Sequence, residues 1–435
     1  MTMHQKKRIA LHWQILIGML AGVIFGLLAV NFGWIEFTGN WIKPWGIIFI
    51  NLLKLIAIPL IIASLISGVS GLNDVSRLSR MGLKTISLYI VTTVIAISTG
   101  LLVVNLTNPG KFLPHEKAME FQQKFASNLD QQAVGKSAAN GPLQFVVDLV
   151  PDNIFAALTN NGSMLQVIFF SLLFGVAIIM LPESKTKPIK DFFEALNEVV
   201  MKMIHLVMSV APIGVFSLIA ALLVDVAGSN PTDTLALFSS LGMYALTVMI
   251  GLLVIVFVIY PFIIRTFTIL RFKDFLKGIA PAQLLAFSTS SSAATLPMTM
   301  ECCEDNLGVK KEISSFVLPL GATINMDGTS LYQAVAAVFI AQIYGMDLDF
   351  MQQMTIILTA TLASIGSAAV PGAGMIMLVI VLTSVGIPTE GIALVFAVDR
   401  PLDMMRTVVN VTGDATISCI IAHQENKLIP PDNLS

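Results

Sequence analysis

Apolar residues in this chain are gathered into long runs that short polar segments separate. Six runs predict membrane-crossing helices, at residues 12–31, 45–70, 84–106, 143–181, 204–227 and 235–264. The fourth run is interrupted near Pro151 and at Asn160, so we expect a break within it. In lipid the backbone must satisfy its own hydrogen bonds. The pattern therefore predicts an all-α polytopic membrane protein.

Two later apolar segments, at residues 280–300 and 355–385, are interrupted by small and polar residues. Each predicts two short helices that meet at a tip. Cytoplasmic loops carry an excess of lysine and arginine. Lys310 and Lys311 stay on the cytoplasmic side, and Asp347 outside, only if both segments re-enter the membrane without crossing it. We therefore expect eight transmembrane helices, two re-entrant helical hairpins and cytoplasmic N- and C-termini.

Two segments carry polar residues at membrane depth. The apolar run at residues 313–344 is interrupted at its centre by Asn325-Met326-Asp327-Gly328-Thr329. A broken helix is tolerated there only where it is buried in protein or lines a watery cavity, which is the usual setting of a solute or ion site. The final span, at residues 392–421, places five polar residues on one helical face: Asp399, Asp403, Arg406, Asn410 and Asp414. This excess of carboxylates over cations is expected where cations come from solution.

The two hairpin segments also resemble each other. Residues 292–297 are similar to residues 367–371, and each hairpin precedes a helix that contains Asn-x-x-Gly. The opposite sides from which the hairpins enter make this an inverted repeat.

Composition excludes several other classes of protein. The chain of 435 residues is 55% hydrophobic, and its charged share of 12% is about half the ~25% of soluble domains. The formal net charge of −2 gives no reason to expect a nucleic-acid partner. Its 3 cysteines imply no disulfide framework. No pair of histidines stands at ligand spacing, so we expect no transition-metal site.

Four motifs together resemble those of the glutamate transporter family of dicarboxylate/amino acid:cation symporters, in a prokaryotic form. They lie at residues 290–297, 321–329, 370–374 and 403–410. The resemblance covers nearly the whole chain. It implies a multi-pass protein of the cell inner membrane, in contact with lipid, that forms a homotrimer and moves its substrate by an elevator mechanism.

The resemblance also implies a division into scaffold and transport domains. Residues 12–82 would hold scaffold helices 1 and 2, and residues 83–110 helix 3 of the transport domain. Residues 111–227 would form an external loop with scaffold helices 4 and 5. Residues 228–421 would complete the transport domain with helix 6, hairpin 1, helix 7, hairpin 2 and helix 8, and residues 422–435 would be a cytoplasmic tail.

By the same resemblance, the substrate is an acidic amino acid and the coupling ion is Na+. Asp403 would bind the substrate ammonium, Arg406 and Thr329 its side-chain carboxylate, and Asn410 and Ser292 its α-carboxylate. The full substrate set is Ser291, Ser292, Thr329, Val370, Gly374, Asp403, Arg406, Thr407 and Asn410. Three cation sets are implied: Gly321, Asn325, Asn410 and Asp414; Tyr89, Thr92, Thr93, Asn325 and Asp327; and Thr323, Met326, Ser364, Ile365 and Ser367.

Departures from the family pattern refine this expectation. Gln333 stands where proton-coupled relatives carry glutamate, which favours sodium coupling without a proton step. The family's extra arginine is absent from the positions of Ser290 and Met404. The first alternative is a C4-dicarboxylate:cation symporter, against which Asp403 argues, because a dianion without an amino group would leave that carboxylate unpaired. The sequence lacks the signatures of an intramembrane aspartyl protease, so no enzyme is expected. A passive channel is a third class of alternative.

Overall fold

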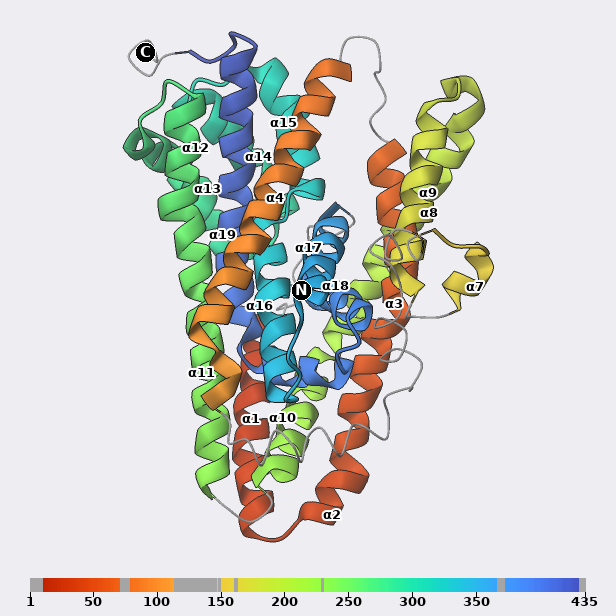
Figure 1. Ribbon diagram of the computed structural model, residues 1–435, viewed down its shortest axis with the longest axis vertical. Helices are drawn as coiled ribbons and strands as arrows, with labels where there is room; N and C mark the ends of the chain where they lie inside the picture. The colour runs from red at the N-terminus through yellow and green to blue at the C-terminus, as the bar shows by residue number, and fades with distance from the viewer. Residues whose placement is uncertain are drawn as a thin grey trace, which may run out of the picture.

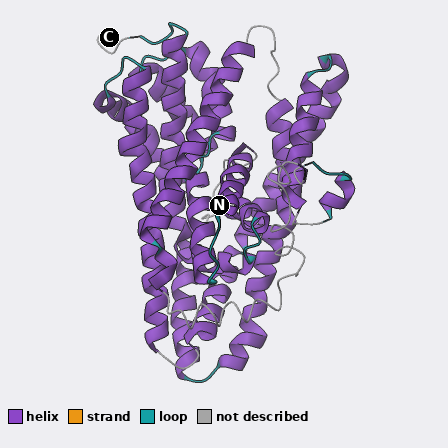
Figure 2. Ribbon diagram, in the orientation of Figure 1, coloured by secondary structure: helices purple, strands orange, loops and turns teal. Residues whose placement is uncertain are grey.

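The computed structural model describes residues 11–70, 79–112, 147, 150–159, 163–227, 231–365 and 372–429. Within these ranges the regular elements are helices, apart from an isolated β-bridge between Val309 and Leu428 (Figure 2). Three of the described helices are long and apolar enough to span a membrane: Ile35–Ser70, Met81–Lys111 and Ser239–Phe267. A bent pair of helices adds a fourth candidate span.

One group of helices packs around α3. It comprises α1 (Leu11–Asn31), α2 (Ile35–Phe37), η1 (Thr38–Ile42), α3 (Lys43–Ser70), α7 (Ile154–Leu158), α8 (Met164–Ile179), α9 (Glu183–Ser209) and α10 (Ala211–Ala227). Helix α3 contacts α8, α9 and α10, and α1 lies along α10. The approach of α1 to α10 is close, because a Cβ on Gly18 would lie 2.4 Å from the Pro212 carbonyl oxygen.

A second group contains the remaining described helices. It comprises α4 (Ser79–Thr107), η2 (Pro109–Phe112), α11 (Pro231–Val254), η4 (Ile255–Ile259), α12 (Tyr260–Phe267), α13 (Phe272–Thr289), α14 (Ser292–Glu301), η5 (Cys302–Asn306), α15 (Lys311–Ile324), α16 (Asp327–Ile343), α17 (Phe350–Ile365), α18 (Ala373–Ser384), η6 (Thr389–Gly391) and α19 (Ile392–Gln424). Helix α16 lies against α4 and α19, and the second group meets the first where α18 contacts α3 and α19 contacts α10. In Figure 1, α17 and α18 lie between α16 and α3.

The interrupted segments form pairs of short helices that pack against each other. Helices α13 and α14 are joined through Ser290, whose φ of 51° is left-handed, and Ser291, which caps α14. Helices α17 and α18 form the corresponding second pair. Residues 366–371 of its predicted tip lie outside the described residues.

The expected single helix at residues 204–227 is wrong in one respect. Helix α9 ends at Ser209, α10 begins at Ala211, and the two are bent by 51°. Pro212 explains the break, because its ring has no N–H to donate and collides with a carbonyl one turn earlier. Within 143–181, α7 ends at Leu158 and α8 begins at Met164, and Asn160 of the predicted break lies outside the described residues.

Candidate functional site

The break between α15 and α16 occupies Asn325 and Met326, the first two residues of the predicted polar segment. One side chain from α17 satisfies two backbone groups at the break. The Ser364 hydroxyl donates to the Ile324 carbonyl at 2.9 Å and accepts from the Met326 N–H at 3.2 Å. The break is therefore stabilised by a specific contact with the second helix pair. It is buried in protein.

Asp327 begins α16 and is fully buried among hydroxyl groups. Thr93 donates to its Oδ1 at 2.7 Å, and Tyr260 donates to its Oδ2 at 2.9 Å. Thr92 lies 3.5 Å from Oδ1 but also donates to its own helix at 3.1 Å. No ion pair to Asp327 occurs among the described residues, so this carboxylate is solvated only by neutral donors.

Asp414 lies beside the break on α19. Asn325 Nδ2 donates to its Oδ1 at 2.9 Å, while the buried Asn325 Oδ1 has no hydrogen-bond partner among the described atoms. A Cβ on Gly321 would lie 2.4 Å from the Tyr89 hydroxyl oxygen and 2.5 Å from Asp414 Oδ1, so these oxygens converge on glycine backbone. Buried carboxylates and an unpaired amide oxygen are oxygen ligands of the kind that suit a hard cation. The first two predicted cation sets are thus largely brought together around the break.

The third predicted cation set is described only in part, and within it the Met326 N–H donates to Ser364. Thr323 is exposed, and its hydroxyl donates to the Leu320 carbonyl at 2.9 Å, whereas Ser364 is engaged at the break. Ile365 ends α17 and Ser367 lies outside the described residues. The role of this set stays a prediction.

Arg406 is a fully buried arginine on α19 with one half of its guanidinium unpaired. Its Nη2 donates to Asp399 at 2.9 Å and to Asp403 Oδ1 at 2.8 Å. The guanidinium carbon lies 3.8 Å from the centroid of the Tyr332 ring. Its Nε and Nη1 are buried and have no hydrogen-bond partner among the described atoms. Leaving buried donors of a charged group without a partner costs free energy, so these N–H groups are suited to bind an anion.

The unpaired Nη1 of Arg406 faces the start of α18. A Cβ on Gly374 would lie 3.5 Å from Arg406 Nη1 and 3.0 Å from Thr329 Cγ2. Asn410 accepts the Gly328 N–H at 2.8 Å and donates to Thr329 at 3.2 Å and to the Met326 sulfur at 3.2 Å. The structure thus brings Thr329, Gly374, Arg406 and Asn410 together.

The other predicted substrate residues are placed as follows. Thr407 donates to the Asp403 carbonyl within α19 at 2.8 Å. Ser291 accepts the Ala294 N–H at 3.2 Å as the cap of α14, and Ser292 is buried in the first turn of that helix, which packs against α19. Val370 lies outside the described residues.

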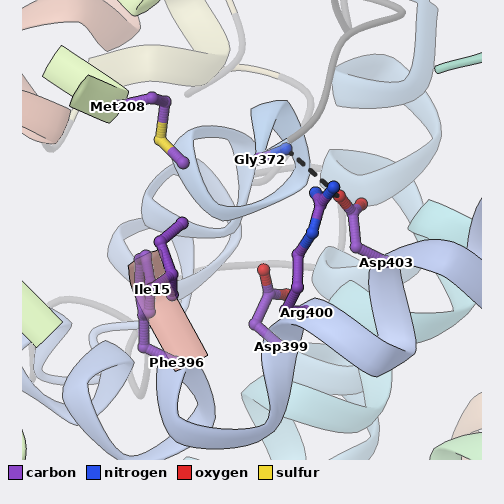
Figure 3. Close-up of a pocket in the computed structure, with 7 residues that line it drawn as sticks. All are labelled: Ile15, Met208, Gly372, Phe396, Asp399, Arg400 and Asp403. Atoms are coloured by element: carbon purple, nitrogen blue, oxygen red, sulfur yellow. Dashed lines mark hydrogen bonds and ion pairs between the residues drawn. The ribbon is translucent and has the colours of Figure 1, made fainter. Parts of the chain in front are cut away.

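Sequence reasoning missed two residues that contact the site. Tyr260 reaches Asp327 from α12, and Arg400 Nη1 donates to Asp403 Oδ2 at 3.2 Å. The Gly372 N–H donates to the same oxygen at 3.3 Å (Figure 3). The three-residue spacing of Arg400 and Asp403 on one helix is a signal that could have revealed the pair. Nothing in the sequence points from Tyr260 to Asp327.

A small pocket of about 20 Å³ opens beside the Arg400–Asp403 pair. Figure 3 shows it where the two helix groups meet, lined by Ile15, Met208, Gly372, Phe396, Asp399, Arg400 and Asp403. It places a polar wall of α19 opposite apolar side chains of α1 and α9.

Close packing of α16 on α19 fixes the relation between the break and Arg406. A Cβ on Gly328 would lie 2.5 Å from the Arg406 carbonyl oxygen, a backbone atom that cannot rotate away. We expect Gly328→Ala to destabilise the protein by about 1–3 kcal/mol through overpacking. The measurement is the thermal unfolding midpoint of the purified protein in detergent. Gly68→Ala is the matched control, since nothing lies within 4 Å of that added Cβ, and equal midpoints for both variants would contradict the argument.

Long apolar helices around buried, partly unpaired charged groups define a multi-pass membrane protein. Residues 11–424 match the Sodium:dicarboxylate symporter family, and the chain belongs to that family. It is therefore a transporter and not an enzyme, which removes the intramembrane protease.

The chain is similar to bacterial and animal transporters over most of its length. It is 37% identical over 427 residues to the proton/glutamate-aspartate symporter of Escherichia coli, covering 97% of this chain and 94% of the relative. Identity is 37% over 426 residues to the proton/sodium-glutamate symport protein of Geobacillus stearothermophilus, covering 97% and 96%. Identity is 38% over 421 residues to excitatory amino acid transporter 2 of Homo sapiens, covering 87% of this chain and 72% of the relative.

Proposed function

We propose that this protein is a sodium-coupled symporter that takes up L-aspartate or L-glutamate across the cell inner membrane. The observation that carries this proposal is the pair of buried, unpaired nitrogens Nε and Nη1 of Arg406. Their N–H groups are donors on a charged group, so they can hydrogen-bond the carboxylate oxygens of an acidic side chain. The names of the bacterial relatives, which are glutamate or glutamate-aspartate symporters, support the same substrate class.

In this proposal the substrate lies between α16, α18 and α19. Arg406 and Thr329 bind its side-chain carboxylate, and Asn410 binds its α-carboxylate together with Ser292 from the first helix pair. Asp403 binds the ammonium group. Sodium ions bind around Asp327 and Asp414, where no basic side chain among the described residues neutralises the carboxylates.

Sodium and substrate are coupled in this proposal through the break. Gly328 N–H donates to Asn410, and Asp327 is the adjacent residue, so an ion that orders the break also orders a substrate ligand. Relatives are named as proton- or sodium-coupled, so the choice of ion rests on this chain's own residues. Gln333 donates to the Gly374 carbonyl at 3.4 Å, and an amide cannot carry a transported proton.

We also propose the elevator mechanism, with the α3 group as scaffold and the second group as the moving transport domain, in a homotrimer. The separation of the helices into two groups supports this division, as do two pairs of short helices in place of full spans. Eight transmembrane helices, two re-entrant hairpins and cytoplasmic termini remain part of the proposal. The helix pairs act as gates over a site that travels with its domain.

One observation favours a second candidate, a C4-dicarboxylate:cation symporter. Arg400 already pairs with Asp403 Oδ2 at 3.2 Å, so a dianion without an ammonium group leaves that carboxylate compensated. The physical objection to a dicarboxylate substrate is weaker than the sequence alone suggests.

Counterflow in proteoliposomes tests these functions together. Vesicles loaded with aspartate, glutamate or succinate are assayed in sodium, lithium or a proton gradient without sodium. The proposal expects exchange of aspartate or glutamate that requires sodium. Exchange of succinate alone would establish the second candidate, and exchange driven by protons without sodium would overturn sodium coupling. Accumulation against a gradient excludes a passive channel.

A further inference from the structure

Arg400 places a second guanidinium against the carboxylate that is assigned to the substrate ammonium. We propose that Arg400 is a specificity-determining residue, because it occupies Asp403 Oδ2 and so competes with the ammonium of an amino acid but not with a dicarboxylate. This inference rests on the proposed function and names a selection step within the same site.

The contacts of Asp403 support this competition. Its Oδ1 is held by Arg406 at 2.8 Å, which leaves Oδ2 as the oxygen open to a further cation. Arg400 Nη1 lies 3.2 Å from Oδ2, and the Gly372 N–H approaches the same atom at 3.3 Å. An ammonium group that binds Oδ2 must therefore displace Arg400 or lie next to its positive charge.

The position of Arg400 allows such a displacement. Its side chain is 16% exposed, against 0% for Arg406, and it borders the small pocket between the two helix groups. Its Nε is buried without a hydrogen-bond partner among the described atoms, so a single hydrogen bond to Asp403 holds the guanidinium. Arg406, by contrast, is fixed by two carboxylates and an aromatic ring.

Charge counting gives the direction of the effect. Asp399, Asp403, Arg400 and Arg406 together are neutral. An acidic amino acid brings a charge of −1 and succinate brings −2, and the difference is the ammonium at Asp403. Removing Arg400 frees Asp403 for the ammonium and withdraws a positive charge from the dianion. Both effects shift selection toward the amino acid. A residue that only braced α19 would instead weaken both ligands alike.

The test uses Arg400→Gln in full-length protein reconstituted in proteoliposomes. The readout is the ratio of the half-inhibitory concentrations of succinate and L-aspartate against the radiolabelled substrate that wild type accumulates. We expect Arg400→Gln to raise this ratio at least about tenfold, the order expected for a partly desolvated charge pair. Arg400→Met, which also removes the charge, is the second variant and is checked for folding by gel filtration.

Two controls separate charge from structure. Arg400→Lys keeps the positive charge and should leave the ratio within about threefold of wild type, the margin set by a changed hydrogen-bond geometry. Lys54→Gln removes a cation paired with Glu390 at 3.5 Å, outside the site, and should leave the ratio unchanged. A ratio that neither Arg400→Gln nor Arg400→Met raises overturns the inference while leaving the proposed uptake intact. Failure of wild type to accumulate any acidic substrate overturns the proposed function itself.

Discussion

Arg406→Cys is expected to reduce the kcat/KM for L-aspartate or L-glutamate uptake at least about 30-fold. Truncating one member of a buried, hydrogen-bonded charge pair costs about 2–5 kcal/mol, and each 1.4 kcal/mol is about a tenfold change. The variant loses the donor edge for the substrate carboxylate and leaves Asp399 and Asp403 without their shared cation. Initial rates of uptake into proteoliposomes measure the effect.

Two variants serve as controls for Arg406→Cys. Arg265→Cys removes an exposed arginine from α12 and should transport as wild type does. Arg406→Lys keeps the charge but loses the planar fork, so its kcat/KM should fall between those of wild type and Arg406→Cys. Unchanged uptake of acidic substrates by a folded Arg406→Cys protein would remove the central argument for substrate binding.

Asp327→Asn should raise the sodium concentration that gives half-maximal uptake by about tenfold or more, since cation affinity depends on the number of charged ligands. The order of preference among aspartate, glutamate and succinate should not change, because Asp327 contacts Thr93 and Tyr260 and belongs to no substrate contact described above. Uptake of each substrate is measured over a series of sodium concentrations at constant ionic strength.

Asp347→Asn is the matched control, because Asp347 is an exposed acid in the loop between α16 and α17. Its sodium dependence should equal that of wild type. The opposite pattern in Asp327→Asn, altered substrate choice with a normal sodium response, would show that the break binds the substrate and not the cation.

Local sequence pattern was sufficient to predict the elements that carry the site. The break at Asn325 and Met326 was evident because amide and carboxylate groups interrupt an apolar run, and the helical face from Asp399 to Asp414 follows from spacing alone. What the sequence could not predict depends on contacts between distant elements. Ser364 and Tyr260 reach the break from α17 and α12, and no local signal specifies either contact.

The points at which the structure differs from the sequence-based predictions also have local causes. The apolar run through Val210 concealed the bend between α9 and α10, because hydropathy does not register the missing N–H of Pro212. The ion pair between Arg400 and Asp403 was not predicted either. In the structure Asp403 is shared between two arginines, Arg400 and Arg406.

The Ser364 hydroxyl serves two backbone groups of the break at once, donating on one side and accepting on the other. If α17 moves away, the Ile324 carbonyl and the Met326 N–H both lose their partner inside the protein. Whatever tightens the break must therefore also hold α17 in place, and whatever displaces α17 must loosen the break by the same free energy. In the proposed symporter, in which ions bind at the break, ion affinity and the position of α17 are therefore coupled, and a change in one implies a change in the other.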